Sequence, residues 1–269
     1  MIGEKSDMAF TVHHAAKRVM RICAALLLTV LLALPADHRL HAGEGAAMFA
    51  EGALPSLAPL VKRVAPAVVA VTSSRRPPGW FAVDPGAGFP DAPLPRELQV
   101  AGAGVIVNAD LGLIVTSNHV VDNAEAISVA LADGRQFDAT MLAYSAHDDL
   151  AVLRIEPARL TAVGLGDSKA VEVGDFVLDF GNPLGGGQTT TFGIVSALHR
   201  SCPGIENRDL VVTDALFERG NSGGPLLDLR GQLIGINVAR TGGSEGAGYG
   251  FAVPVDAVRE LLATVRLSG

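Results

Sequence analysis

The chain has 269 residues, which is enough for one domain of about 200 residues with extensions. Its formal net charge of −7 argues against a nucleic-acid partner, because phosphate binding calls for a basic surface. The two cysteines, Cys23 and Cys202, are too few and too far apart for a disulfide framework, and no Cys/His cluster has metal-ligand spacing. We therefore expect no metal and no other cofactor.

Residues 1–42 contain an export signal. Lys17-Arg18 and Arg21 precede an apolar run at residues 22–34, and small residues follow it, which is typical of a secretory signal peptide. Cleavage is expected after Ala36 or Ala42. The apolar run is shorter than the ~20 residues that a spanning helix needs, yet an uncleaved membrane anchor through residues 22–34 remains the alternative. Either form predicts an exported protein, in the periplasm or secreted.

The rest of the chain is dominated by strand patterns. Residues 43–65 predict an arm and a short helix, residues 66–160 a first β-barrel with an inserted Pro/Gly-rich loop at 74–97, and residues 161–269 a second β-barrel plus a C-terminal helix. Strands are expected at residues 67–72, 99–107, 112–117, 126–131, 136–144 and 149–155, and then at 175–181, 188–198, 209–215, 225–229, 232–239 and 247–253. The predicted fold class is all-β, with two six-stranded antiparallel β-barrels.

The most informative stretch is Gly220-Asn221-Ser222-Gly223-Gly224. A serine between glycines on a tight turn can project its hydroxyl while backbone N–H groups converge nearby, as a nucleophile with an oxyanion hole requires. The donors would be Gly220 and Ser222, with Asn221 as a further candidate. An ordinary glycine-rich turn is the alternative interpretation.

The same five residues fit the nucleophile elbow of α/β-hydrolases. In that fold the catalytic histidine follows the serine in the chain, but here the last histidine, His199, precedes Ser222. The subtilisin order could use Asp110, but the alternating strands and helices of that scaffold are lacking. The remaining order of catalytic residues along the chain is His, Asp, Ser, which is the chymotrypsin order.

His119 is the candidate general base, because it ends the apolar strand at 112–117 and is held by rigid structure. Asp149 is the candidate orienting carboxylate, because it opens another apolar strand, where a partly buried charge needs a partner. Asp148 is one residue out of phase and should point the other way. His147 and His199 are interpreted as turn and loop residues.

Successive motifs of the chain resemble those of the HtrA (Deg) proteases over residues 54–265. The matching stretches are Thr116-Ser117-Asn118-His119-Val120-Val121, Asp149-Leu150-Ala151-Val152-Leu153, Leu165-Gly166-Asp167-Ser168, Phe180-Gly181-Asn182-Pro183-Leu184-Gly185, Gly193-Ile194-Val195-Ser196-Ala197-Leu198, Gly220-Asn221-Ser222-Gly223-Gly224-Pro225-Leu226 and Gly250-Phe251-Ala252-Val253-Pro254. The resemblance implies a trypsin-like serine endopeptidase of protein quality control, with His119, Asp149 and Ser222 as its triad. It also implies unfolded or misfolded polypeptides as substrates, a homotrimer, and Arg200 as the activation-loop residue. The PDZ domain that usually follows is expected to be absent.

Specificity should depend on Leu216, six residues before the serine, where trypsin-like enzymes that select Arg or Lys have an aspartate. With Phe217 beside it, an apolar floor cannot compensate a buried cation, so cleavage after small aliphatic residues is expected. Ile236, Asn237 and Val238 are the other predicted substrate-binding residues. The alternative function is an exported chaperone-like or peptide-binding module with little hydrolytic activity.

Overall fold

The computed structural model describes residues 56–75, 98–181, 187–207, 209–215, 220–240 and 248–265. The predicted export signal, the arm up to residue 55 and residues 76–97 of the inserted loop lie outside the described residues, as do Leu216 and Phe217. Residues 58–269 form one compact unit.

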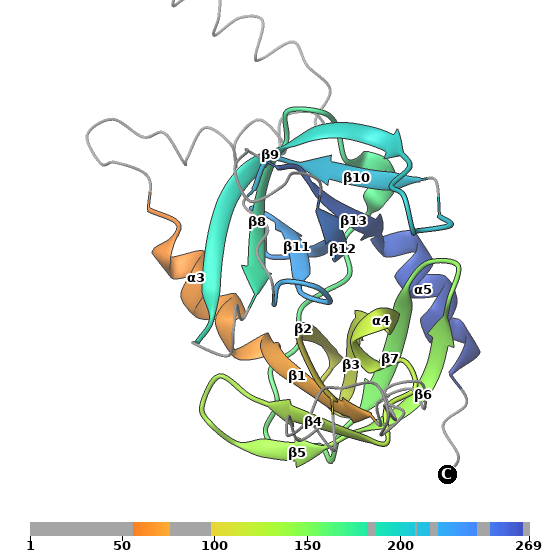
Figure 1. Ribbon diagram of the computed structural model, residues 1–269. Coiled ribbons are helices and arrows are strands. Elements are labelled where there is room, and N and C mark those ends of the chain that lie inside the picture. The colour runs from red at the N-terminus through yellow and green to blue at the C-terminus, as the bar shows by residue number, and fades with distance from the viewer. Residues whose placement is uncertain are drawn as a thin grey trace, which may run out of the picture. The chain divides into compact units, whose positions relative to one another are not determined.

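Two antiparallel sheets make up this unit (Figure 1). The first sheet has the strand order β5-β4-β1-β2-β3-β7-β6. Its strands are β1 (Val68–Arg75), β2 (Leu98–Asn108), β3 (Leu113–Ser117), β4 (Ala126–Ala130), β5 (Gln136–Asp138), β6 (Thr140–Ser145) and β7 (Leu150–Arg154).

The predicted strand at 136–144 is two strands in the structure. β5 pairs with β4 at one edge of the first sheet, and β6 pairs with β7 at the other edge. Only Ala139 separates them, and its backbone N–H still bonds to Ile127 of β4 at 2.9 Å. Because the two edge strands are consecutive in the chain, the sheet must curl toward itself. The expected six-stranded barrel is thus present as a curled sheet in which one strand is divided.

The second sheet is a closed barrel with the order β10-β13-β12-β11-β8-β9. Its strands are β8 (Phe176–Gly181), β9 (Thr189–Arg200), β10 (Leu210–Thr213), β11 (Pro225–Asp228), β12 (Leu233–Arg240) and β13 (Gly250–Pro254). The all-β fold class with two barrels is confirmed, and the strands of the second set lie within a few residues of the predicted positions.

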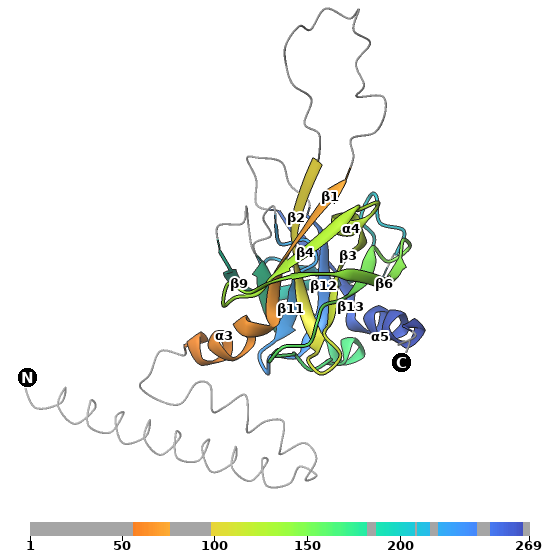
Figure 2. The same cartoon turned by 90° about the horizontal axis from the view of Figure 1, so that it is seen from below.

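Helices flank the sheets. α3 (Ala58–Val64) leads through η1 (Ala65–Ala67) into β1, and α5 (Val255–Thr264) follows β13; the two lie on opposite sides of the sheets (Figures 1 and 2). The short elements α4 (Asn118–Val121) and η3 (Ser168–Ala170) complete the described structure. Of the helices in the described ranges, none is long and apolar enough to cross a bilayer.

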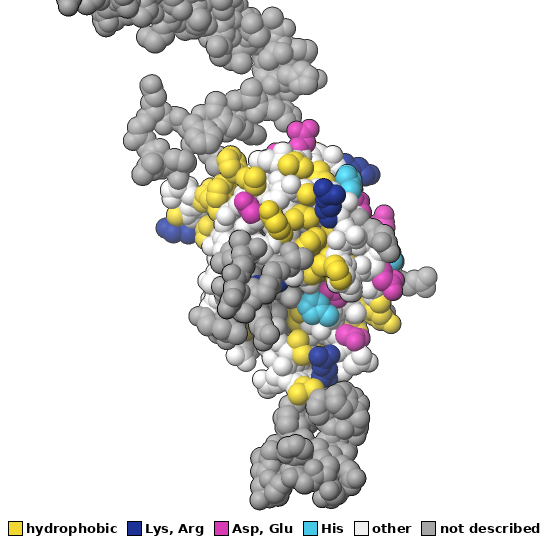
Figure 3. All heavy atoms as spheres, turned by 45° about the horizontal axis from the view of Figure 1, so that its top comes forward, with side chains coloured by type: hydrophobic (Ala, Val, Ile, Leu, Met, Phe, Trp, Pro, Cys, Tyr) yellow, Lys and Arg dark blue, Asp and Glu magenta, His cyan; other side chains and the backbone are white. Residues whose placement is uncertain are grey.

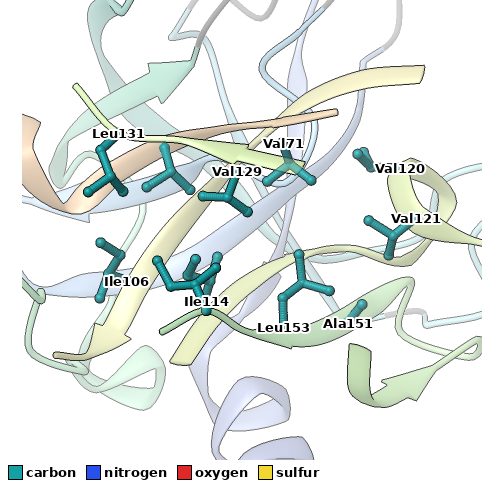
Figure 4. Close-up of a cluster of buried hydrophobic side chains, with 11 residues drawn as sticks. Val71, Ile106, Ile114, Val120, Val121, Val129, Leu131, Ala151 and Leu153 are labelled. Carbon is teal, nitrogen blue, oxygen red and sulfur yellow. The ribbon is translucent and has the colours of Figure 1, made fainter. Parts of the chain in front are cut away.

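Each barrel has its own hydrophobic core, as alternating apolar residues predict. In the first sheet the cluster includes Ile106, Ile114 and Leu153, together with Val120 and Val121 from α4 (Figure 4). In the second barrel the cluster contains residues from β8 to β13. The core of the first sheet therefore extends to the helical turn that carries His119.

Candidate active site

His119 and Asp149 are joined by two hydrogen bonds, one between the two side chains and one from the His119 backbone to the Asp149 carboxylate. The His119 Nδ1 atom lies 2.6 Å from Asp149 Oδ2, and the His119 backbone N–H donates to Asp149 Oδ1 at 2.8 Å. The Asn118 N–H also donates to the Asp149 carbonyl at 2.9 Å. The His119 side chain is 45% exposed and the Asp149 side chain only 10%. The imidazole can therefore meet a substrate while the carboxylate behind it is shielded.

The position of His119 follows from the residues around it. It lies in α4, directly after β3, whose residues are all buried. Val120 and Val121 pack into the core of the first sheet (Figure 4), so the two residues that follow His119 anchor its turn. Ser73 donates to the Val120 carbonyl at 2.5 Å and adds a polar anchor.

Asp149 has a left-handed backbone, with φ of +53°. Asparagine and aspartate tolerate this region better than other non-glycine residues, but it is still sparsely populated. In this conformation the carboxylate reaches α4, where it bonds to both the backbone and the ring of His119. Strain at this position is therefore compensated by the three hydrogen bonds to Asn118 and His119.

The turn that carries Ser222 is packed tightly against the first sheet. Gly223 has φ of +83°, and a Cβ at this position would overlap Thr116 Oγ1 and the Ala103 carbonyl. Only glycine fits both the conformation and the space. The Ser222 carbonyl accepts from Ala103 N–H at 2.8 Å, which ties the turn to β2.

The same contacts bring the serine turn beside the histidine turn. A Cβ on Gly102 would lie 2.7 Å from Val120 Cγ2 and 2.8 Å from the Ser222 carbonyl, so these two groups flank one glycine of β2. Ser117 Oγ donates to the Asn237 carbonyl at 2.8 Å, and Gly223 N–H donates to the same oxygen at 2.7 Å. Within the described residues no hydrogen bond joins the His119 ring to the Ser222 hydroxyl. Such bonds commonly tighten only when substrate binds.

The predicted oxyanion-hole residues are in the described part of the turn, although residues 216–219 before them are not. Gly220 has φ of +102°, a conformation that side chains rarely adopt. Asn221 is 2% exposed, and its side chain points into the second barrel, where its Nδ2 donates to Asp179 Oδ2 at 2.6 Å. Its side chain is therefore not available to an oxyanion, which leaves backbone N–H groups as the donors.

Asp179 was missed in the sequence. It lies in the middle of β8, is 1% exposed, and accepts hydrogen bonds from Asn221 and Asn237. Burial raises the pKa of this carboxyl to about 7, although the two amides and the Phe180 backbone act in the opposite direction. The available signal was a single carboxylate in the otherwise apolar stretch Phe176-Val177-Leu178-Asp179-Phe180.

The remaining predicted substrate residues lie next to the turn. Ile236, Asn237 and Val238 are buried on β12, and Ile236 pairs with Pro225 just after the serine turn. Arg200 ends β9, is exposed, and lines a cavity of about 350 Å³ with Tyr249.

The other two described histidines take no part in this arrangement. His147 is paired with Asp148 in an exposed turn. His199 is exposed and paired with Asp209, but it lies near the end of strand β9, so its interpretation as a loop residue was wrong. Although burial opposes ionisation of Asp148, hydrogen bonds from Ser145, His147 and Asn207 hold its pKa below the usual value. Both oxygens of Asp148 thus bond to residues other than His119, although Asp148 and Asp149 lie in a turn and not in a strand.

Two antiparallel barrels with a His–Asp pair on one and a glycine-flanked serine turn on the other define the trypsin-like peptidase class. The Trypsin-like peptidase domain family matches residues 102–236. The periplasmic pH-dependent serine endoprotease DegQ of Escherichia coli K12 is 42% identical over 256 residues, covering 91% of this chain and 56% of DegQ. The periplasmic serine endoprotease DegP of the same strain is 40% identical over 276 residues, covering 91% of this chain and 58% of DegP.

A solved structure of the HtrA-type protease AlgW with a tripeptide superimposes with a TM-score of 0.66 at 37% identity, covering 78% of this chain and 63% of that one. The crystal structure of the serine endoprotease from Yersinia pestis has a TM-score of 0.63 at 32% identity, covering 79% of this chain and 67% of that one. The chain therefore belongs to the HtrA (Deg) family of trypsin-like serine peptidases. It spans a little more than half the length of the curated relatives.

Proposed function

We propose that this protein is an exported serine endopeptidase that hydrolyses peptide bonds in unfolded or misfolded polypeptides. The observation that carries the proposal is that Asp149 forms hydrogen bonds with both the backbone and the ring of His119, beside the turn that contains Ser222. This is the arrangement that activates a serine hydroxyl, because the carboxylate fixes the proton on Nδ1 and leaves Nε2 free to accept one.

In the proposed mechanism, Ser222 Oγ attacks the substrate carbonyl as His119 Nε2 accepts the hydroxyl proton. The resulting oxyanion is bound by the backbone N–H groups of Gly220 and Ser222, with Asn221 as a third candidate. His119 then gives its proton to the leaving amine, and the C–N bond breaks to leave an acyl-serine. Water, deprotonated by His119, hydrolyses this ester and restores Ser222. Asp149 stays ionised throughout and stabilises the imidazolium that forms in each step.

The substrate side chain before the cleaved bond would enter a site bounded by Leu216 and Phe217 and by Ile236, Asn237 and Val238 of β12. The Asn237 backbone is already engaged, since its N–H donates to the Gly224 carbonyl at 3.0 Å and its carbonyl accepts from Gly223. This fixes β12 relative to the nucleophile turn. An apolar floor at Leu216 favours Val, Ala or Ile over Arg or Lys, because a cation buried there would lack a counter-charge.

Several surface features support an unfolded polypeptide as substrate. The described residues include the exposed large hydrophobics Val173, Phe176, Phe192 and Tyr249, which is the kind of surface that binds apolar segments. On the face shown in Figure 3, hydrophobic side chains gather with only scattered charges between them. Export and a homotrimeric assembly are part of the same proposal, with an uncleaved tether through residues 22–34 as the alternative to cleavage of the signal.

The test is hydrolysis of casein by the wild-type protein and by the Ser222→Ala variant. Loss of the nucleophile costs on the order of 10⁶ in turnover in enzymes of this type, so the variant should show no measurable hydrolysis while its circular dichroism spectrum is unchanged. Residual activity above about a tenth of wild type would refute the role of Ser222. A folded wild type that binds casein without cleaving it would instead support the chaperone-like alternative.

A further inference from the structure

Asp179 is a carboxyl group inside the wall of the closed barrel. Its neighbours across the sheet are Thr191 on β9 and Leu226 on β11, and it shares the inward face of β8 with Val177 of the core cluster. A lone carboxyl in such surroundings is costly unless hydrogen bonds satisfy it. Its retention there therefore calls for a role that an apolar side chain could not fill.

Its two partners come from the two segments that shape the candidate active site. Asn221 precedes Ser222 in the nucleophile turn, and its Nδ2 donates to Asp179 Oδ2 at 2.6 Å. Asn237 lies on β12, and its Nδ2 donates to Asp179 Oδ1. The side chain of Asn221 also covers Gly181, where an added Cβ would overlap its amide. One carboxylate thus connects the nucleophile turn to the strand beside the substrate site.

The cluster is not fully satisfied. The Oδ1 atoms of Asn221 and Asn237 are both buried and have no hydrogen-bond partner in the described structure. When Asp179 is ionised it only accepts, so both amides must present their N–H₂ groups and leave both oxygens unpaired. When Asp179 is protonated, its O–H can donate to one amide oxygen, but only if that amide turns over. The two protonation states therefore require different orientations of Asn221 or Asn237.

We propose that Asp179 is a positioning residue of the peptidase, which in its ionised form holds Asn221 and Asn237 in the orientations that align the Ser222 turn with β12. The inference rests on the proposed role of Ser222 as nucleophile. Protonation of Asp179 releases one amide, loosens the turn and slows the reaction, so activity rises with pH as Asp179 ionises.

Other charges around Asp179 are already engaged or lie at strand ends. Asp228 on β11 is paired with Arg230 at 2.9 Å, and Arg75 on β1 donates to the Asp122 carbonyl at 3.5 Å. β13 and the turn 220–224 carry no charged side chain, and β8 carries none besides Asp179. The titratable or charged side chains on the described elements packed against β8 are Arg75, His199, Arg200, Asp228 and Arg240. Burial is therefore the main influence on the pKa of Asp179 and raises it to about 7. At neutral pH both the ionised and the protonated form of this carboxyl are then populated.

The experiment compares the wild type with Asp179→Asn, which cannot ionise and which mimics the size of the neutral acid. We measure kcat and KM for casein peptides, and the rate of covalent labelling by a fluorophosphonate probe, from pH 5 to pH 9. At pH 8 the variant should have a kcat about tenfold lower with KM changed less than about threefold, because misplacement of a reacting group affects turnover. The ratio of wild-type to variant kcat should fall toward one at pH 5.

Asp138→Asn, the same exchange on the exposed strand β5, is the matched control and should follow the wild type at every pH. Asn221→Ala removes one amide instead of the carboxylate. Even if Asp179→Asn fails to fold, this variant should show the lower kcat at pH 8 and the same fall of the wild-type to variant kcat ratio toward one at pH 5. A kcat ratio that is constant with pH, or a variant as active as wild type at pH 8, would overturn the proposal. If wild type and Asp138→Asn themselves lack hydrolysis that depends on Ser222, the proposed function fails instead.

Discussion

Replacing Asp149 with asparagine would change the proton pattern of the candidate site while leaving its shape in place. The new amide oxygen can still accept from the His119 backbone N–H, as Asp149 Oδ1 does at 2.8 Å. The amide nitrogen then faces His119 Nδ1, where Asp149 Oδ2 lies at 2.6 Å in the structure. Because an N–H₂ group only donates, Nδ1 must become the acceptor and the ring proton must move to Nε2. The ring can then no longer take the proton from Ser222.

The expected loss follows from this change of tautomer. In serine peptidases the same exchange lowers kcat by about 10⁴, which corresponds to roughly 5 kcal/mol of transition-state stabilisation. Stability should change much less. Asparagine tolerates the left-handed backbone at this position, φ +53°, as well as aspartate does. Loss of one charge-assisted hydrogen bond should cost about 2 kcal/mol of unfolding free energy.

The assay is kcat/KM for a casein-derived peptide, with urea unfolding of the same samples. Asp148→Asn is the matched control, since this neighbouring carboxylate binds Ser145, His147 and Asn207 instead of His119, and its activity should stay within about threefold of wild type. An Asp149→Asn variant that keeps more than about a tenth of wild-type kcat would refute the assignment of Asp149 as the orienting carboxylate.

Three further outcomes are expected. Gly223→Ala should lower the unfolding free energy by more than about 3 kcal/mol in urea titrations, because the new Cβ would overlap Thr116. Gly134→Ala, where the backbone φ is similar but the space around it is open, should lower it by only about 1 kcal/mol. Equal losses in the two variants would contradict the packing argument. The pKa of Asp179 is raised from 3.8 to about 7, so the stability it contributes is present below pH 4 and is lost as pH rises through 7. The unfolding free energy of Asp179→Asn minus that of wild type should therefore grow by about 4 kcal/mol between pH 4 and pH 8. A difference that stays constant with pH would contradict the argument that burial raises this pKa. Mass-spectrometric mapping of digests should find cleavage after Val, Ala or Ile, with Leu216→Asp shifting it toward Arg and Lys; cleavage mainly after Arg by wild type would contradict the predicted apolar floor.

Much of the fold could be predicted because the signals are local. Apolar runs bounded by turn residues predicted the strands, and Asp133-Gly134, a typical hairpin sequence, lies in the turn between β4 and β5. The division of the strand at 136–144 could not be predicted, because Ala139 carries no turn signal. It follows instead from the pairing of β5 with β4 and of β6 with β7.

The pairing of His119 with Asp149 was predictable from the position of each residue at the end or mouth of an apolar strand. The left-handed backbone at Asp149 was not, because it depends on contacts with residues 30 positions away. Asp179 was missed for a related reason. Its partners are 42 and 58 residues further along the chain, and only the closed barrel brings them together.

The most direct test of the account is covalent labelling with a fluorophosphonate probe, followed by peptide mass mapping, in the wild type and in His119→Ala. The account predicts one modified residue in the wild type, Ser222, and a rate of labelling lower by at least about a hundredfold in the variant, since the hydroxyl then lacks its base. Modification of another residue, or undiminished labelling of Ser222 without His119, would contradict it.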